Sequence, residues 1–264
     1  MYAFEYHRPS SLAEVTALLS KAEDGKLLAG GQTYIPTLKQ RLARPSDVID
    51  LGRVAELKGI REEGGAVVVG AMATHAEVTA SDVVRRMIPG LAELAGKIGD
   101  PQVRARGTIG GSLANNDPAA DYPAAVLALN ATVHTNTRTI AADDFLLGMF
   151  ETALEPGEII TAVRFPKADK AAYEKFRHPA SRYAVVGVMV ARTGGQVRVG
   201  VTGAAPCAYR WTEAEQALSS SWNPSAVDGL AVDPSEMNSD LHASSEYRAH
   251  LVRVMTKRAV EAAG

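Results

Sequence analysis

The segment that decides the fold is Gly107–Asp121, which reads GTIGGSLANNDPAAD. It places two adjacent glycines, Gly110 and Gly111, between the hydroxyl side chains of Thr108 and Ser112. Glycines allow main-chain N–H groups to converge on one concavity and allow a ligand to approach the backbone closely. We interpret the segment as a loop that forms either a tight turn or a site for a phosphate group.

A second glycine pair lies upstream, in LAGGQTYI at Leu28–Ile35. The apolar residues before it predict a buried strand, and 35–42 predict a helix with Pro36 in its first turn. A helix that begins behind a glycine loop adds partial positive charge, which suits a phosphate or diphosphate. Gln32 and Thr33 could add donors. Taken alone, however, this pair favours a tight turn, because it matches no standard nucleotide-binding motif.

The residues after the second glycine pair are amides and carboxylates. Asp117 followed by Pro118 predicts a helix that starts there and runs to about Leu129. Asp121 would then share a face with Asp117, either as a solvated side chain or as an acceptor for polyol hydroxyls. The amides before this helix, at 115–116, are consistent with a turn or with ligand contact. A diphosphate loop followed by a carboxylate suits a ligand that carries both phosphates and a polyol.

The rest of the chain predicts an α+β fold in three parts. Residues 1–56 contain a strand–helix–strand pattern, which predicts a small βαβ unit. Residues 57–169 alternate hairpin, helices and strands, which predicts a larger mixed α/β subdomain. Residues 170–264 contain a β-hairpin signal at 183–202 and a terminal amphipathic helix at 245–263, which predicts a C-terminal hairpin and helix domain.

Composition excludes several classes of function. The 264 residues carry a net charge of −2 and no strongly basic segment, which argues against a nucleic-acid partner. The single cysteine, Cys207, cannot hold an iron–sulfur cluster by itself and fits a reducing cytoplasm. None of the histidines pairs with another at metal-ligand spacing, so we expect no metal site. No catalytic group, signal segment or membrane contact is predicted.

The two motifs together resemble the FAD-binding medium subunit of the molybdenum hydroxylases, the family of aerobic carbon monoxide dehydrogenase and xanthine dehydrogenase. The resemblance rests on AGGQT at 29–33, TIGGS at 108–112 and the following Asp121. It continues through EPGEIITAVRFP, YEKFRHPASRYAVVGV and SDLHASSEYRAHLVRVMTKRAVEAA, and so covers nearly the whole chain.

This resemblance implies an FAD cofactor and a set of residues that hold it. Residues 1–56 and 57–169 would form a two-part FAD-binding domain, and residues 170–264 would cover the flavin and dock a partner. We expect the FAD to be noncovalent, because the two glycine segments offer only Tyr34 as a residue that could bond to the ring. Residues 28–35 would wrap the diphosphate, and residues 108–112 would form the other diphosphate loop. Asp121 would bind a hydroxyl of the flavin side chain. Ile160 and Lys175 would lie near the ring. The residues implied are Leu28, Ala29, Gly30, Gly31, Gln32, Thr33, Tyr34, Ile35, Thr108, Ile109, Gly110, Gly111, Ser112, Asp121, Ile160 and Lys175. Leu94 occupies the position of a ring-contacting aromatic residue of xanthine dehydrogenases, and Tyr183 is an alternative aromatic contact.

The resemblance also implies partner chains. A large subunit with the molybdenum cofactor would oxidise the substrate, a small subunit would carry two [2Fe–2S] clusters, and the three chains would form a dimer of heterotrimers. This chain would receive electrons on FAD and pass them to an external acceptor. The alternatives are a stand-alone flavin-dependent oxidoreductase of the same fold and a non-enzymatic nucleotide-binding module. The substrate and the acceptor remain open.

Overall fold

The N-terminal part of the chain forms a three-stranded parallel sheet with the order β1-β3-β2. The structure is a computed structural model that describes residues 1–264. Val15 and Ile49 are fully buried between this sheet and the turns that follow it. The arrangement confirms the predicted βαβ unit. Its elements are β1 (Glu5–His7), α1 (Leu12–Leu19), β2 (Gly25–Leu28), α2 (Tyr34–Lys39) and β3 (Asp47–Asp50), followed by single 3₁₀ turns at Leu51–Arg53 and Ala55–Leu57.

The central part contains a five-stranded antiparallel sheet with the order β4-β5-β10-β6-β7. The largest apolar core of the molecule packs between this sheet and the surrounding helices. Its elements are β4 (Ile60–Glu63), β5 (Ala66–Gly70), α3 (His75–Ala80), α4 (Asp82–Met87), α5 (Pro89–Gly96), α6 (Pro101–Arg104), α7 (Ile109–Asn115), α8 (Tyr122–Ala128), β6 (Thr132–Thr135), β7 (Thr139–Ala141), α9 (Ala142–Phe145), β8 (Leu146–Gly148), β9 (Glu151–Thr152) and β10 (Ile160–Pro166).

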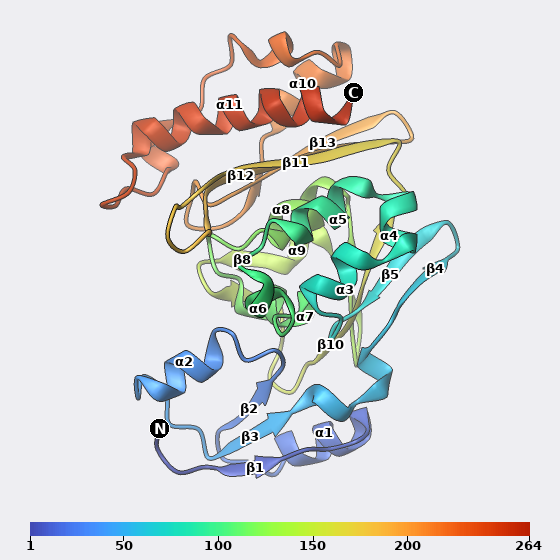
Figure 1. Ribbon diagram of the computed structural model, residues 1–264, viewed down its shortest axis with the longest axis vertical. Helices are drawn as coiled ribbons and strands as arrows, with labels where there is room; N and C mark the ends of the chain where they lie inside the picture. Colours follow the sequence, from blue (N-terminus) through green and yellow to red (C-terminus); the bar gives the residue numbers. More distant parts are fainter.

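The C-terminal part is a four-stranded antiparallel sheet with the order β11-β12-β13-β14. Helix α11 lies on one side of it, and α5 and α8 of the central part lie on the other (Figure 1). Its elements are β11 (Lys170–Arg177), β12 (Ala184–Thr193), β13 (Gln196–Thr202), β14 (Tyr209–Arg210), α10 (Thr212–Ser220) and α11 (Ser245–Ala263), with 3₁₀ turns at Pro224–Val227 and Pro234–Glu236. The α+β class and the C-terminal hairpin and helix are thus confirmed.

Close packing fixes the C-terminal sheet on the central part. A Cβ at Gly200 of β13 would overlap the carbonyl oxygen of Ala124 in α8. A Cβ at Gly90 of α5 would lie 2.5 Å from the carbonyl oxygen of Ala171 in β11. Because real Cβ atoms do not approach so closely, only glycine allows these helices to contact the strands directly.

Several local predictions differ from the structure. The strand before the first glycine pair has no fully buried residue, and the helix expected at 35–42 ends at Lys39. The segment at 108–112 is not a loop, because Thr108 caps α7 and accepts a hydrogen bond from the Gly111 N–H at 3.1 Å. The helix expected at Asp117 begins only at Tyr122. The cause is tertiary: the Thr202 hydroxyl and the Gly203 N–H donate to the carbonyl of Pro118, at 3.0 and 2.8 Å. That carbonyl is therefore engaged by the C-terminal sheet instead of by a helix, and residues 117–120 form a turn.

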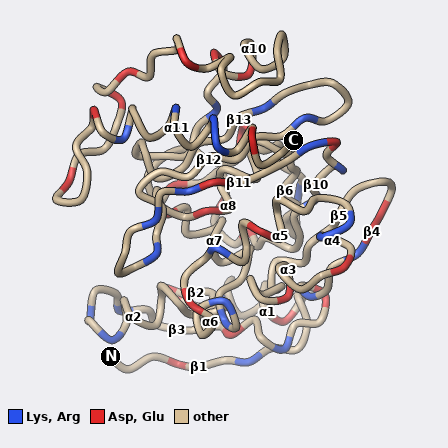
Figure 2. The backbone as a smooth tube through the Cα atoms, turned by 45° about the horizontal axis from the view of Figure 1, so that its top comes forward, with Lys and Arg blue, Asp and Glu red and all other residues tan.

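Charged residues of both signs are distributed over all three parts of the molecule (Figure 2). No helix has both the length and the apolar character that crossing a membrane requires. No group of three or more histidine, cysteine, aspartate or glutamate side chains is arranged to hold a metal ion.

Candidate functional site

The two glycine segments meet at a cavity of about 700 Å³, which is lined by residues from all three parts of the chain. A Cβ at Gly30 would overlap the main chain of Arg106, directly before the second segment. A Cβ at Gly110 would lie 2.7 Å from the carbonyl oxygen of Ala71. Gly30 and Gly110 are therefore both required by chain packing. Gly30 packs the first segment against the start of the second, and Gly110 packs the second segment against Ala71.

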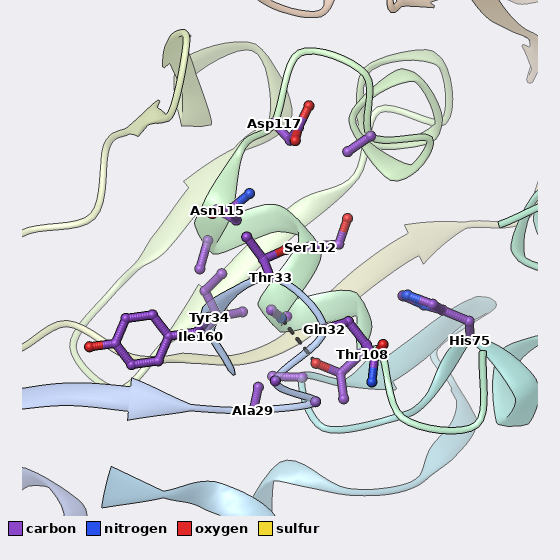
Figure 3. Close-up of a pocket in the computed structure, with 18 of the residues that line it drawn as sticks. Ala29, Gln32, Thr33, Tyr34, His75, Thr108, Ser112, Asn115, Asp117 and Ile160 are labelled. Atoms are coloured by element: carbon purple, nitrogen blue, oxygen red, sulfur yellow. Dashed lines mark hydrogen bonds between the residues drawn. The ribbon is translucent and has the colours of Figure 1, made fainter. Parts of the chain in front are cut away.

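The first segment presents a row of unpaired donors. The main-chain N–H groups from Ala29 to Thr33 have no acceptor within the protein. Gly31 has a φ of +74°, a conformation that favours glycine and turns the chain around the cavity. The side chains of Gln32 and Thr33 also line the cavity (Figure 3). Successive free N–H groups in such a turn form an anion-binding concavity, so the segment fits a phosphate or diphosphate.

The second segment contributes in a different way, although its sequence is similar. The N–H groups of Ile109 and Gly110 donate to the carbonyls of Ala73 and Ala71, at 3.1 and 2.9 Å, and the Gly111 N–H donates to Thr108. These amides are therefore not available to a ligand. The segment offers instead the bare surface of Gly111 and the hydroxyl of Ser112, which faces the cavity across from the first segment (Figure 3).

Asp121 lies on the cavity wall with only 4% of its surface exposed. Its Oδ1 accepts hydrogen bonds from the Tyr173 hydroxyl at 2.6 Å and from the Lys175 ammonium at 2.8 Å. Its Oδ2 accepts none within the protein, and so remains free to accept a ligand hydroxyl. Burial raises the pKa of Asp121, and the neighbouring Lys175 and Tyr173 oppose that rise.

A second carboxylate on the wall is already neutralised. Glu158 accepts hydrogen bonds from Arg138 and from the hydroxyls of Thr135 and Thr137, at 2.8 to 2.9 Å. The Arg138 guanidinium holds the pKa of Glu158 well below its ordinary value. Glu158 is thus bound within the protein, and Asp121 is the buried carboxylate with a free oxygen.

Apolar and aromatic side chains also line the cavity. Ile160 lines it, as does Tyr183, which lies on the β11–β12 connection and has 46% of its surface exposed. On the same connection, the Arg182 guanidinium donates to the carbonyl of Gly99 across the cavity at 3.3 Å. Leu94 does not line the cavity: it is fully buried in the central core. Tyr183, the alternative aromatic contact, is therefore the better placed of the two.

Most of the residues expected at the site from the sequence line this cavity. Four do not, and each lies directly behind a residue that does. Leu28 ends β2, Ile35 packs on Gly31, Ile109 is fully buried in the core, and Lys175 lies behind Asp121 with 2% of its side chain exposed. Asn115 lines the cavity, whereas the Asn116 amide donates to the carbonyls of Gly148 and Glu151, both at 2.8 Å, and is structural.

His75 is a wall residue that the sequence did not single out. It is 5% exposed, and its Nδ1 has no hydrogen-bond partner. Burial, together with the charge of Arg104, lowers the pKa of His75 to about 4, so the imidazole is neutral at physiological pH. Its only sequence signal is its place after Thr74 in a helix-capping box, which indicates a helix start and not a ligand contact.

Comparison with known proteins agrees with this geometry. Residues 2–168 match the FAD binding domain in molybdopterin dehydrogenase, and residues 171–263 match the CO dehydrogenase flavoprotein C-terminal domain. The chain is 40% identical to the carbon monoxide dehydrogenase medium chain of Afipia carboxidovorans, over 99% of this chain and 96% of that one. It is 37% identical to the nicotine 6-hydroxylase medium subunit of Paenarthrobacter nicotinovorans, over 99% and 98%.

The fold comparison gives the same answer. A crystal structure of the Cu,Mo-CO dehydrogenase in its cyanide-inactivated form superposes with a TM-score of 0.91 and 39% identity, over 98% of this chain and 97% of that one. The fold and the cavity thus define a flavin-binding subunit of an oxidoreductase, with FAD as its cofactor. The chain belongs to the family of FAD-binding medium subunits of the molybdenum hydroxylases.

Proposed function

We propose that this chain is the electron-transfer subunit of a molybdenum-containing hydroxylase or dehydrogenase. It would take electrons from the [2Fe–2S] clusters of a small partner subunit and pass them to an external acceptor. The observation that carries the proposal is the presence, in one cavity, of the free N–H groups of 29–33 and the free Oδ2 of Asp121. The first group fits a diphosphate and the second fits the hydroxyl of a polyol, and FAD carries both.

The chain's own residues would bind and orient the cofactor. Residues 28–35 would wrap the diphosphate, and Gly111 and Ser112 would pack against it from the other side. Asp121 would accept a hydroxyl of the flavin side chain. Ile160 and Tyr183 are the apolar and aromatic lining residues that would contact the ring, and Lys175 would act through its ion pair with Asp121. When bound, FAD supplies the redox chemistry, while the protein determines its position and its surroundings.

The names of the relatives support partner chains for this subunit. Relatives named as medium chains or medium subunits imply a large and a small partner. We propose a large molybdenum subunit and a small iron–sulfur subunit in a dimer of heterotrimers. Residues 1–56 and 57–169 would hold FAD, and residues 170–264 would cover it and contribute to docking. The single free Cys207 is consistent with a reducing cytoplasm. The names of the relatives differ in substrate, so the substrate class stays open.

Co-purification tests this proposal. We expect the tagged chain, expressed from its native context, to bring down two partner chains together with molybdenum, iron and FAD, and we expect acid precipitation to release the FAD. A chain that instead purifies alone and oxidises an organic substrate would be a stand-alone flavoenzyme. A chain that purifies without flavin absorbance and cannot be loaded with FAD would be a nucleotide-binding module of another kind.

A further inference from the structure

Behind the cavity lies a polar network that is entirely buried. Tyr173 is fully buried, Asp121 is 4% exposed, and 2% of the Lys175 side chain is exposed. Tyr173 and Lys175 are two residues apart on β11, so their side chains project from the same face of the strand. Both donate to one oxygen of Asp121. Because a buried carboxylate is costly unless it is hydrogen-bonded and paired, these two donors are what keep Asp121 in place as an acceptor.

A glycine on the neighbouring strand makes the network possible. Gly187 of β12 lies opposite Lys175 in the strand register. A Cβ at this position would overlap the Tyr173 hydroxyl oxygen. Any residue other than glycine would therefore displace the phenol from its place beside Asp121. The space kept for this hydroxyl is a second observation, independent of the hydrogen bond, that ties Tyr173 to Asp121.

We propose that Tyr173 is a positioning residue for the FAD site: its hydroxyl holds Oδ1 of Asp121 and leaves Oδ2 to accept a hydroxyl of the flavin side chain. This inference rests on the proposed function, because it concerns the same cavity. Tyr173 itself does not line the cavity and acts through Asp121. Burial, together with the negative charge of Asp121, raises the pKa of Tyr173 well above its ordinary value. The phenol therefore stays protonated and donates throughout the physiological pH range.

Loss of this hydroxyl changes the protonation of Asp121 in a defined direction. Burial raises the pKa of Asp121, and the hydrogen bond from Tyr173 is one of the contributions that lower it. Without that bond the pKa of Asp121 rises further, and the carboxylate takes up a proton at a higher pH. Several elements bring charged or titratable groups to Asp121: Lys175 and Tyr173 from β11, Lys97 from after α5, Tyr122 from α8 and Tyr183 from the β11–β12 connection. Asp117, in the preceding turn, lines the same cavity and acts on Tyr183.

The test is FAD binding by the full-length apoprotein, titrated by fluorescence at a series of pH values, for the wild type and three variants. For Tyr173→Phe we expect affinity at neutral pH to fall roughly tenfold, since one hydrogen bond to a charged group is lost. We also expect that, as the pH is lowered, the affinity of this variant declines at a higher pH than that of the wild type. Gly187→Ala should likewise lower the affinity and raise the pH at which affinity declines, because it displaces the phenol without removing it.

Tyr122→Phe is the matched control. Tyr122 is fully buried directly after Asp121, but its hydroxyl has no hydrogen-bond partner. Its removal should leave FAD affinity and its pH dependence unchanged. If Tyr173→Phe and Gly187→Ala fold, as judged by circular dichroism, and bind FAD with the affinity and pH profile of Tyr122→Phe, Tyr173 has no positioning role. A wild-type chain that fails to bind FAD would overturn the proposed function itself, and this inference with it.

Discussion

Replacement of Gly111 by valine should remove FAD binding without unfolding the chain. Gly111 lies in the first turn of α7 and has no positive φ, so a valine can adopt its backbone conformation. A Cβ would lie 3.0 Å from Thr108 Oγ1 and 3.3 Å from the Cβ of Ala29, which requires shifts of only a few tenths of an ångström. The two methyl groups of valine would then extend from this narrow gap into the cavity beside the free N–H groups of the first segment.

The two expected magnitudes are very different. Valine is a slightly better helix former than glycine, and its close contacts offset that gain, so the free energy of unfolding should change by less than about 1 kcal/mol. A displaced diphosphate would lose at least two charge-assisted hydrogen bonds of about 1.5–3 kcal/mol each, which lowers FAD affinity by roughly a hundredfold or more.

Urea unfolding of the apoprotein and fluorescence titration with FAD measure these two quantities separately. Gly229→Val is the control, because a Cβ at Gly229 has no neighbour within 4 Å. If Gly111→Val binds FAD as tightly as Gly229→Val does, the second glycine segment serves only chain packing, and the assignment of the diphosphate to this gap is wrong.

Three further variants test other parts of the site. Asp121→Ala should weaken FAD binding by about 1.5–3 kcal/mol in a titration, which is less than Gly111→Val; unchanged affinity would remove Asp121 from the site. Gly30→Ala should lower the free energy of unfolding by about 1–3 kcal/mol in urea, since its Cβ would overlap the main chain of Arg106; wild-type stability would contradict the close approach. The pKa of His75 is about 4 in the folded state, below its value in the unfolded state. As the pH falls, the unfolded state therefore takes up this proton at a higher pH than the folded state does. Stability should therefore fall by up to about 3 kcal/mol as the pH drops from 6.5 to 4, and His75→Gln should show a flatter profile; equal slopes would show that His75 is not buried as a neutral group.

Local sequence signals predicted the fold class and most of its elements. The hairpin signal at 183–202 placed β12 and β13 close to their observed bounds, Ala184–Thr193 and Gln196–Thr202, because the glycine pair at 194–195 marks the turn between them. The helical pattern placed α11 at Ser245–Ala263, because that helix buries one regular face. The helix expected at Asp117 failed because its signal is local, whereas the deciding interaction comes from Thr202 on a distant strand. Such long-range competition for a carbonyl leaves no trace in the residues around Asp117.

Lining residues of the cavity could be predicted where the residue type itself indicates a ligand contact. They could not be predicted where the role of a residue depends on packing and burial. Glycine pairs and a following aspartate indicated the two segments and Asp121. The different roles of the two segments could not be inferred, because only packing against Ala71 and Ala73 consumes the amides of the second. His75 was missed for a related reason: its burial beside Gly107 depends on the fold and not on its neighbours in the chain.

The most direct test of the central claim is the reduction of FAD on the isolated chain. The chain would be expressed without partners, loaded with FAD, and followed by flavin absorbance under anaerobic conditions. Sodium dithionite would be added in one experiment, and carbon monoxide or candidate organic substrates in the others. If the subunit only relays electrons, dithionite should bleach its FAD, and the FAD should remain oxidised with every substrate. Efficient bleaching by a substrate with no partner chain present would contradict the relay and would show a self-contained flavoenzyme.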